Sequence, residues 1–146
     1  MEMPSLKELF TAENFQSTIQ NYCDQIGWSV AGMNQDQAIL VFEMESGREQ
    51  IVSIIRFDQI LEFTVPTMIE SETEEDIPHE LSTTLMKQNA GMSFGFWAIK
   101  QINDKFTFCI MHNLLFELIT VDYFKTVVGA LYSQCEELEE FLLGKG

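Results

Sequence analysis

The chain has 146 residues, and its 23 acidic and 8 basic side chains give it a formal charge of −15 at pH 7 and a pI near 4.2. With 46% hydrophobic residues and a mean hydropathy of +0.01, it has enough apolar surface to fold, which excludes a disordered acidic tail. Phosphate backbones and anionic lipid head groups repel so acidic a chain, so we expect binding neither to nucleic acid nor to a membrane surface. The length and the absence of a linker predict a single domain over residues 1–146.

The composition also predicts a cytoplasmic protein. The first twenty residues contain three glutamates and no apolar run, so they resemble neither a secretory signal nor a transit peptide. No segment approaches the roughly 18 continuous apolar residues of a membrane span. Three widely spaced cysteines without a CxxC pair favour buried, reduced thiols over a redox or metal role: Cys23, Cys109 and Cys135.

The first half of the chain reads as a helix followed by four strands. Apolar residues from Phe15 to Ile26 recur at steps of three and four, and Gly27 follows as a helix stop. Ser5 and Glu8 form a capping signal for a short turn upstream. Segments rich in Val, Ile and Phe, separated by turn residues, then predict an antiparallel meander over residues 28–33, 38–44, 50–57 and 60–65.

An acidic segment and a second helix follow the meander. Five carboxylates in seven positions predict a solvated loop over residues 70–76, which could also dock a basic partner electrostatically: Glu70, Glu72, Glu74, Glu75 and Asp76. This segment lacks the glycine that a calcium-binding loop needs for its sharp turn. Asp76 suits a helix cap and Pro78 a first helical turn, and the helix is expected to end at Gly91.

A hairpin and a long helix complete the chain. Strands at 96–101 and 105–111 flank Asn103 and Asp104, two residues that tolerate the positive φ of a tight turn. From a cap at Thr120, apolar residues alternate steps of four and three through one long amphipathic helix, which is expected to pack on the sheet or on a second subunit. Its opposite face carries four glutamates near the C-terminus, where the helix dipole disfavours each by roughly 0.3–1 kcal/mol: Glu136, Glu137, Glu139 and Glu140.

The order of elements predicts an α+β fold, α-ββββ-α-ββ-α, with a twisted antiparallel sheet in two strand groups and three helices. In IPHELSTTLMKQNAGMSFGFWAIKQ, which starts at Ile77, a Pro-led helix ends in Leu-x-x-x-Asn, at Leu85 and Asn89, just before the second strand pair. This stretch and the Thr-led last helix resemble the YbjN-like domains, relatives of the type III secretion chaperones, from about Thr11 to Leu143. The chain looks most like a cyanobacterial branch of that superfamily, which has no assigned biochemical activity.

The resemblance implies helices packed on one face of the sheet, frequent dimerisation and no catalytic residues. Secretion chaperones of this fold are small acidic dimers that hold an extended segment of a client protein, and the charge of −15 agrees with that. The sequence contains no recognisable client-binding signature. We therefore expect a chaperone-like protein or an adaptor, with a protein partner or client that the sequence does not identify.

An enzyme is the alternative reading. Residues 91–95 match G-x-S-x-G around Ser93, and Asp104 and His112 follow in the order of a hydrolase triad. A nucleophile elbow needs a strand before its serine and a helix after it, whereas here the expected order is reversed. His79 and His112 could join the acidic loop as metal ligands, but no spacing places both on one face. We expect no catalytic residue, no metal and no cofactor.

The strands predict an interface. In residues 51–57 and 96–99 apolar side chains occupy both parities, so both faces of the sheet should be covered. Because three helices are few for that, we expect a homodimer through the sheet or through the last helix. The expected interface residues are apolar ones of the fifth strand and the last helix: Phe96, Trp97, Ile99, Phe124, Val128, Leu131 and Leu138.

Overall fold

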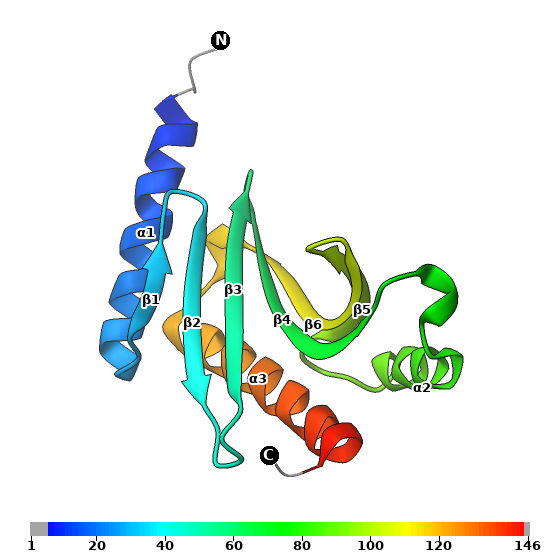
Figure 1. Cartoon of the computed structure of the whole chain (residues 1–146). Helices are drawn as coiled ribbons and strands as arrows, with labels where there is room; N and C mark the ends of the chain where they lie inside the picture. The colour runs from blue at the N-terminus through cyan, green and yellow to red at the C-terminus, as the bar shows by residue number, and fades with distance from the viewer. Residues whose placement is uncertain (1–5, 145–146) are drawn as a thin grey trace.

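A computed structural model describes the backbone of residues 6–144 and the side chains from Asn14 onward (Figure 1). Within this range the α-helices are α1 (Leu6–Ile26), α2 (His79–Asn89) and α3 (Val121–Leu143). The strands are β1 (Val30–Met33), β2 (Gln37–Glu43), β3 (Glu49–Phe57), β4 (Ile60–Ser71), β5 (Phe96–Ile102) and β6 (Lys105–Leu115). Two short 3-10 helices are η1 (Glu74–Asp76) and η2 (Phe116–Leu118). The predicted α+β class and element order are confirmed.

The strands form one antiparallel sheet in the order β1-β2-β3-β4-β6-β5. Figure 1 shows that β4, β6 and β5 curl strongly, while β1, β2 and β3 run nearly straight. The β5–β6 turn is built by Asn103 and Asp104 with φ of 52° and 65°, as predicted for a tight hairpin. None of the described helices combines the length and the apolar character that a membrane crossing requires.

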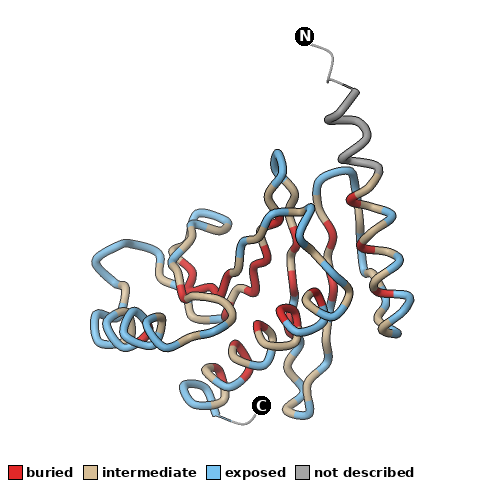
Figure 2. Tube along the Cα trace, turned by 180° about the vertical axis from the view of Figure 1, so that it is seen from behind, coloured by how far each residue is buried: buried red, intermediate tan, exposed pale blue. Residues whose placement is uncertain are grey.

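The core lies between one face of the sheet and the helices. Figure 2 shows α3 crossing that face, with buried positions gathered beneath it. Phe124 of α3 is fully buried, and its ring centroid lies 5.6 Å from Tyr22, 6.0 Å from Trp28 and 6.1 Å from Phe63. Thr120 caps the helix as predicted, because its Oγ1 accepts a hydrogen bond of 3.1 Å from the backbone N–H of Tyr123.

Strand β4 is longer than the sequence pattern predicts. Its register with β6 shifts between Pro66 and Glu70, so a bulge carries the strand on to Ser71. The predicted acidic loop is therefore not a loop throughout: Glu70 pairs with β6 and lies 3.2 Å from the ammonium group of Lys105. Asp76 does not cap α2, because it ends η1 and Pro78 takes the position before the helix.

The C-terminal glutamates of α3 are not all on its solvent face, and that expectation is wrong for two of them. Glu136 and Glu139 are 8% and 2% exposed, and the Nε2 of Gln50 donates to both, at 2.7 and 2.6 Å. The second oxygen of Glu139 accepts from the backbone N–H of Met68 at the β4 bulge, at 2.9 Å. These bonds hold the end of α3 against the sheet despite its unfavourable charge.

Arg48, in the turn just before β3, completes this network. Its Nη2 lies 3.2 Å from Glu136, and its Nη1 donates to the carbonyl oxygen of Gly144 after the helix end, at 2.8 Å. Burial alone would raise the pKa of Glu136, but hydrogen bonds from Ser46, Gln50 and Arg48, with the charge of Arg48, hold this pKa below its ordinary value. The β2–β3 hairpin therefore supplies the positive charge that the last turn of α3 lacks.

The other face of the sheet, which we call the open face, carries no described residue of the helix-packed core. Cross-strand register places an uncharged band on it, running from Val41 and Ile51 on the straight strands towards Cys109 on β6. On the curled half, the 2.8 Å ion pair between Lys100 and Glu62 joins β5 to β4 over β6. Cys109, on the same face, is fully buried.

The sequence places apolar side chains on both faces of the sheet, and packing within one chain covers only part of them. On the straight half of the open face, Val41, Ile51 and Phe57 remain 39–50% exposed. The curled half needs no second layer, because curvature and the ion pair shield it.

Candidate functional site

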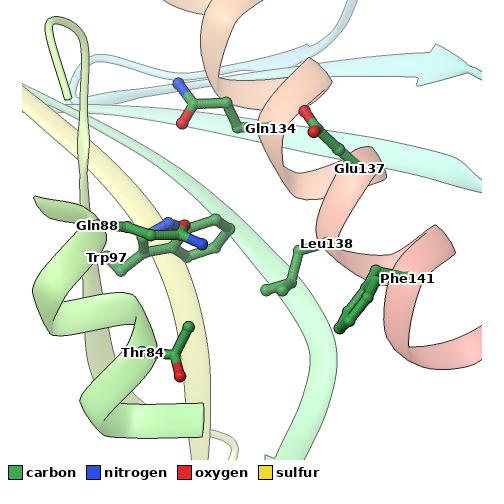
Figure 3. Close-up of a pocket in the computed structure, with 7 residues that line it drawn as sticks. All are labelled: Thr84, Gln88, Trp97, Gln134, Glu137, Leu138 and Phe141. Atoms are coloured by element: carbon green, nitrogen blue, oxygen red, sulfur yellow. The ribbon is translucent and has the colours of Figure 1, made fainter. Parts of the chain in front are cut away.

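A groove separates α2 from the C-terminal half of α3 and has a volume of about 560 Å³, within the range of ligand pockets. It is lined from α2, from β5 and from α3, and Figure 3 shows these side chains converging on one space. The lining residues are Thr84, Gln88, Trp97, Gln134, Glu137, Leu138 and Phe141.

Asn89, the last residue of α2, determines how the groove floor is held. Its Oδ1 accepts from the backbone N–H of Trp97 at 2.6 Å, and its Nδ2 donates to the carbonyl of the same residue at 3.0 Å. The amide thus replaces a neighbouring strand at the edge of β5 and ties α2 to the sheet. Among the described residues of α2 only Leu85 is buried and Leu81 is partly buried against the core, so this junction and two apolar side chains anchor the helix.

Replacing Asn89 with alanine should lower the free energy of unfolding by about 2 kcal/mol, because both backbone groups of Trp97 lose their partner. Chemical denaturation followed by circular dichroism would measure the change. Asn113→Ala is the matched control, since this exposed amide on β6 makes no hydrogen bond with the described residues, and we expect a change within about 0.5 kcal/mol. Equal effects of the two substitutions would contradict this role of Asn89.

The groove combines an apolar floor with unpaired polar groups. Trp97 is 6% exposed, and its buried indole Nε1–H has no hydrogen-bond partner among the described residues. Phe141 projects from α3 with 84% of its surface exposed, although it is a large aromatic residue (Figure 3). Glu137 has no ion pair with any described residue. A buried donor, an exposed aromatic ring and an uncompensated carboxylate are features suited to recognising another molecule.

A second apolar hollow of about 390 Å³ lies between α2 and β5 and shares Trp97 with the groove. Apart from Ser82 its lining is apolar, and it includes Met86, which is 69% exposed. The lining residues are Ser82, Leu85, Met86, Trp97, Ala98, Ile99 and Phe108. Helix α2 therefore stands between two hollows, which leaves much apolar surface around it uncovered.

The structure places the predicted interface residues in four different surroundings. Phe124, Val128 and Leu131 are fully buried in the chain's own core, so their side chains cannot contact a partner while this fold is intact. Trp97 and Leu138 line the groove, and Ile99 lines the second hollow. Phe96 lies on the open face, paired with Met111. The apolar stripe of α3 is thus mostly used within the chain, and its last two turns reach the groove.

The acidic residues before α2 lie at the surface. All five of the predicted electrostatic residues are exposed, and only Glu70 takes part in an ion pair among the described residues. The other four are Glu72, Glu74, Glu75 and Asp76.

The residues of the alternative enzyme reading are not brought together. Ser93 is exposed in the segment between α2 and β5, so a helix precedes it and a strand follows it. Asp104 lies in the β5–β6 turn, eight residues along β6 from His112, which corresponds to about 26 Å of strand. His79 begins α2 and is exposed. In the described part of the chain, no three His, Cys, Asp or Glu side chains form a cluster that could hold a metal.

His112 instead has a structural role, because it joins the loop before β5 to α3. Its Nδ1 accepts from the backbone N–H of Gly95 at 3.1 Å, so Nε2 carries the proton and donates to the hydroxyl of Tyr123 at 2.8 Å. Gly95 has φ of +84°, and a Cβ there would lie 2.6 Å from Leu131, so only glycine fits at this loop. Burial lowers the pKa of His112, in agreement with a neutral ring that accepts from Gly95.

The stability of the protein should therefore fall on acidification through His112. The pKa of this residue is lower in the folded chain than the ordinary 6.5, so the unfolded chain binds more protons just below that value. Its contribution is fully present above about pH 7 and is lost as the pH falls through the folded pKa. Unfolding free energies measured from pH 8 to pH 5 should show a steeper decline for wild type than for His112→Gln. Parallel curves of unfolding free energy against pH for the two proteins would contradict this role of His112.

All three cysteines are free and buried, as predicted. Burial raises the pKa of Cys23 to about 11 and that of Cys109 to about 11. Burial also raises the pKa of Cys135, and the neighbouring Glu139 raises it further. These thiols are therefore protonated at neutral pH, which makes them poor nucleophiles and poor metal ligands.

Sequence reasoning missed most of the groove. Trp97 and Leu138 were expected at an interface, but Thr84, Gln88, Gln134, Glu137 and Phe141 were not. One signal was available: Phe141 falls off the spacing of the buried stripe, at the end of a helix whose other aromatic residues are covered.

No protein-family model and no curated protein matches this sequence. Among solved structures, the chain is similar to one from the HopA1–SchA chaperone–effector complex, with a TM-score of 0.67 and 8% identity, covering 94% of this chain and 99% of that one. It is also similar to YbjN from E. coli, described as a proposed transcription regulator, with a TM-score of 0.58 and 16% identity, covering 86% of this chain and 90% of YbjN. The chain therefore has the fold shared by YbjN and this chaperone–effector complex, as the sequence resemblance predicted.

Proposed function

We propose that this protein is a non-enzymatic, chaperone-like or adaptor protein that binds a protein partner in the groove between α2 and α3. The observation that carries the proposal is the groove itself, which is lined by the exposed Phe141 and by Trp97, whose buried indole N–H has no partner among the described residues. Aromatic residues in partly desolvated pockets contribute most of the binding energy at protein interfaces. The fold shared with a chaperone–effector complex supports a protein as the partner.

We also propose that two copies of the protein form a homodimer through the straight half of the open face. Val41 and Ile51 are directly paired there and are 39% and 44% exposed. The two ion pairs on the curled half, Lys100–Glu62 and Lys105–Glu70, neutralise four of the charges on this face. Glu43 and Glu49 are paired on the same face and have no ion pair with a described residue, so the surface that suits contact between two copies is the apolar band around Val41 and Ile51.

The proposal includes a cytoplasmic location and no binding to nucleic acid. Three free thiols are typical of a reducing compartment. Although YbjN is described as a proposed transcription regulator, a formal charge of −15 opposes contact with a phosphate backbone here.

Site-specific photocrosslinking tests the groove. A photoreactive phenylalanine analogue at position 141, in cells that express the protein, should crosslink to one main partner, because this side chain is exposed at the groove rim. The same analogue at Leu118 is the matched control, since that residue is 67% exposed on η2 and outside the groove lining.

Binding of the purified partner should then depend on the groove. Calorimetric titration should show affinity falling at least about tenfold for Leu138→Glu, which places a charge on the groove wall. A crosslink at position 118 as strong as that at 141, or an unchanged affinity of Leu138→Glu for the partner, would show that the groove is not the binding site.

Sedimentation velocity tests the dimer separately. Ile51→Lys should convert a dimer to a monomer at micromolar concentration, because it buries an unpaired charge in the proposed interface. Leu118→Lys should leave the dimer intact. A wild-type chain that sediments as a monomer at every accessible concentration would end the dimer proposal and leave the groove proposal standing.

A further inference from the structure

We infer that the partner presents a basic, apolar segment to the groove, in which a hydrophobic side chain stands next to Lys or Arg. This inference rests on the proposed function and specifies the chemistry of the partner. It follows from three properties of the groove: its charge, its apolar surface and its free hydrogen-bonding donor.

The charge around the groove is negative and uncompensated. Glu137 lines it, Glu140 follows on the same helix, and neither has an ion pair among the described residues. Helix α2, on the other side, is preceded by the three acidic residues of η1 and carries Glu80 in its first turn, against one basic residue, Lys87. By contrast, the basic residues of the open face are already paired with carboxylates. Unpaired carboxylates such as Glu43 and Glu49 also lie elsewhere, but at the groove an incoming cation finds unpaired counter-charges beside a concave apolar surface.

The apolar surface requires a hydrophobic anchor. Trp97 and Leu138 form the floor and one wall, and the ring of Phe141 stands over the same space from α3 (Figure 3). A purely basic ligand would leave this surface in contact with water. An aliphatic or aromatic side chain of the partner would bury it, and the Phe141 ring could also cover the stem or the cation of a neighbouring Lys or Arg.

The unpaired indole N–H indicates a protein segment. A buried donor without a partner costs about 1–3 kcal/mol, and an occupant that supplies an acceptor would recover this energy once the atoms that cover the N–H move aside. A backbone carbonyl is an acceptor that accompanies every apolar side chain of a peptide. Thr84 and Gln88 of α2 are exposed in the groove lining, where they can form hydrogen bonds with further backbone groups of the partner.

A second copy of this chain fits the groove poorly. Each copy carries the same charge of −15, so two groove faces brought together would set carboxylates against carboxylates. The proposed self-association uses the apolar band of the open face around Val41 and Ile51 instead, and the groove remains free for a partner of opposite charge.

Calorimetric titration with three designed peptides tests the inference. All are amphipathic, about 14 residues long, with leucine at helical spacing, and their polar positions are all Lys, all Gln or all Glu. We expect the Leu/Lys peptide to bind at least about tenfold more tightly than the Leu/Glu peptide, with a difference that shrinks as the salt concentration rises from about 50 to 500 mM. Equal affinities of the Leu/Lys and Leu/Gln peptides would overturn the basic requirement.

Variants show whether binding uses the groove rather than the overall charge. Phe141→Ala should weaken the Leu/Lys peptide about tenfold, while Leu118→Ala should change nothing. Glu137→Lys should weaken it about fivefold, against no more than about twofold for Glu117→Lys on η2. Trp97→Phe, which keeps one aromatic ring but removes the N–H together with the five-membered ring of the indole, should cost about fivefold in affinity. Because Phe141 and Glu137 are exposed, these two variants remain informative if Trp97→Phe fails to fold.

The outcomes separate the inference from the proposed function. Binding of the Leu/Lys peptide that none of these variants weakens would mean charge attraction without a site, and would overturn the inference. A partner crosslinked at position 141 together with no groove-dependent binding of any peptide would also overturn it, while leaving the proposed function intact.

Discussion

Replacing Gln50 with leucine should lower the free energy of unfolding by about 3–5 kcal/mol, one of the two largest effects we expect of a single substitution. The amide of Gln50 donates to both Glu136 and Glu139, which are buried against the sheet. Leucine fills a similar volume but leaves two buried carboxylates without the donor that separates them. Glu136 keeps its contact with Arg48, whereas Glu139 keeps the backbone N–H of Met68.

The loss should depend on pH in a defined direction. Without the amide, one of the two neighbouring carboxyl groups gains by holding a proton in the folded chain. Stability of the variant should therefore fall as the pH rises, so that its deficit relative to wild type is larger at pH 8 than at pH 5. Urea denaturation at both values would measure this. A deficit that is constant with pH, or below about 1 kcal/mol, would contradict the role of the network.

Gln37→Leu is the matched control for this substitution. Gln37 is also a strand glutamine, but it is only partly buried and donates a single hydrogen bond, of 3.0 Å, to the hydroxyl of Ser53. We expect it to cost less than about 1 kcal/mol and to show no pH dependence.

The network also shows where sequence reasoning stops. The charges of Glu136 and Glu139 are visible in the sequence, and so is their unfavourable place at the end of a helix. Their burial cannot be read from the sequence. It depends on the β2–β3 hairpin, some ninety residues away, which places Arg48 and Gln50 within hydrogen-bond distance of Glu136. Periodicity assigns polar residues to solvent, and only tertiary pairing reverses that assignment.

The elements themselves were predictable, because their signals are local. Thr120 caps α3 through the N–H of Tyr123, three residues away, and Asn103 and Asp104 turn the β5–β6 hairpin without help from other segments. The bulge of β4 was not predictable, because Glu139 of α3 binds the N–H that the bulge frees at Met68. The groove was not predictable for the same reason, since its walls come from two helices far apart in the chain.

Phe124→Ala should be as damaging as the loss of Gln50, at about 3–5 kcal/mol, because it leaves a cavity where the rings of Tyr22, Trp28 and Phe63 converge. These rings belong to α1, to the segment after it and to β4, so one side chain joins three parts of the core to α3. Phe141→Ala on the same helix is the matched control, since its ring is 84% exposed and should contribute less than about 0.5 kcal/mol.

The same pair of variants separates folding from binding. Phe124→Ala should shift the denaturation midpoint strongly, and Phe141→Ala should leave the midpoint unchanged while weakening the partner at the groove. A ring that is dispensable for stability but required for binding of the partner would act through a contact with another molecule, as the proposed function requires. If Phe141→Ala lowered stability as much as Phe124→Ala, that explanation would fail, because the ring would then belong to the fold.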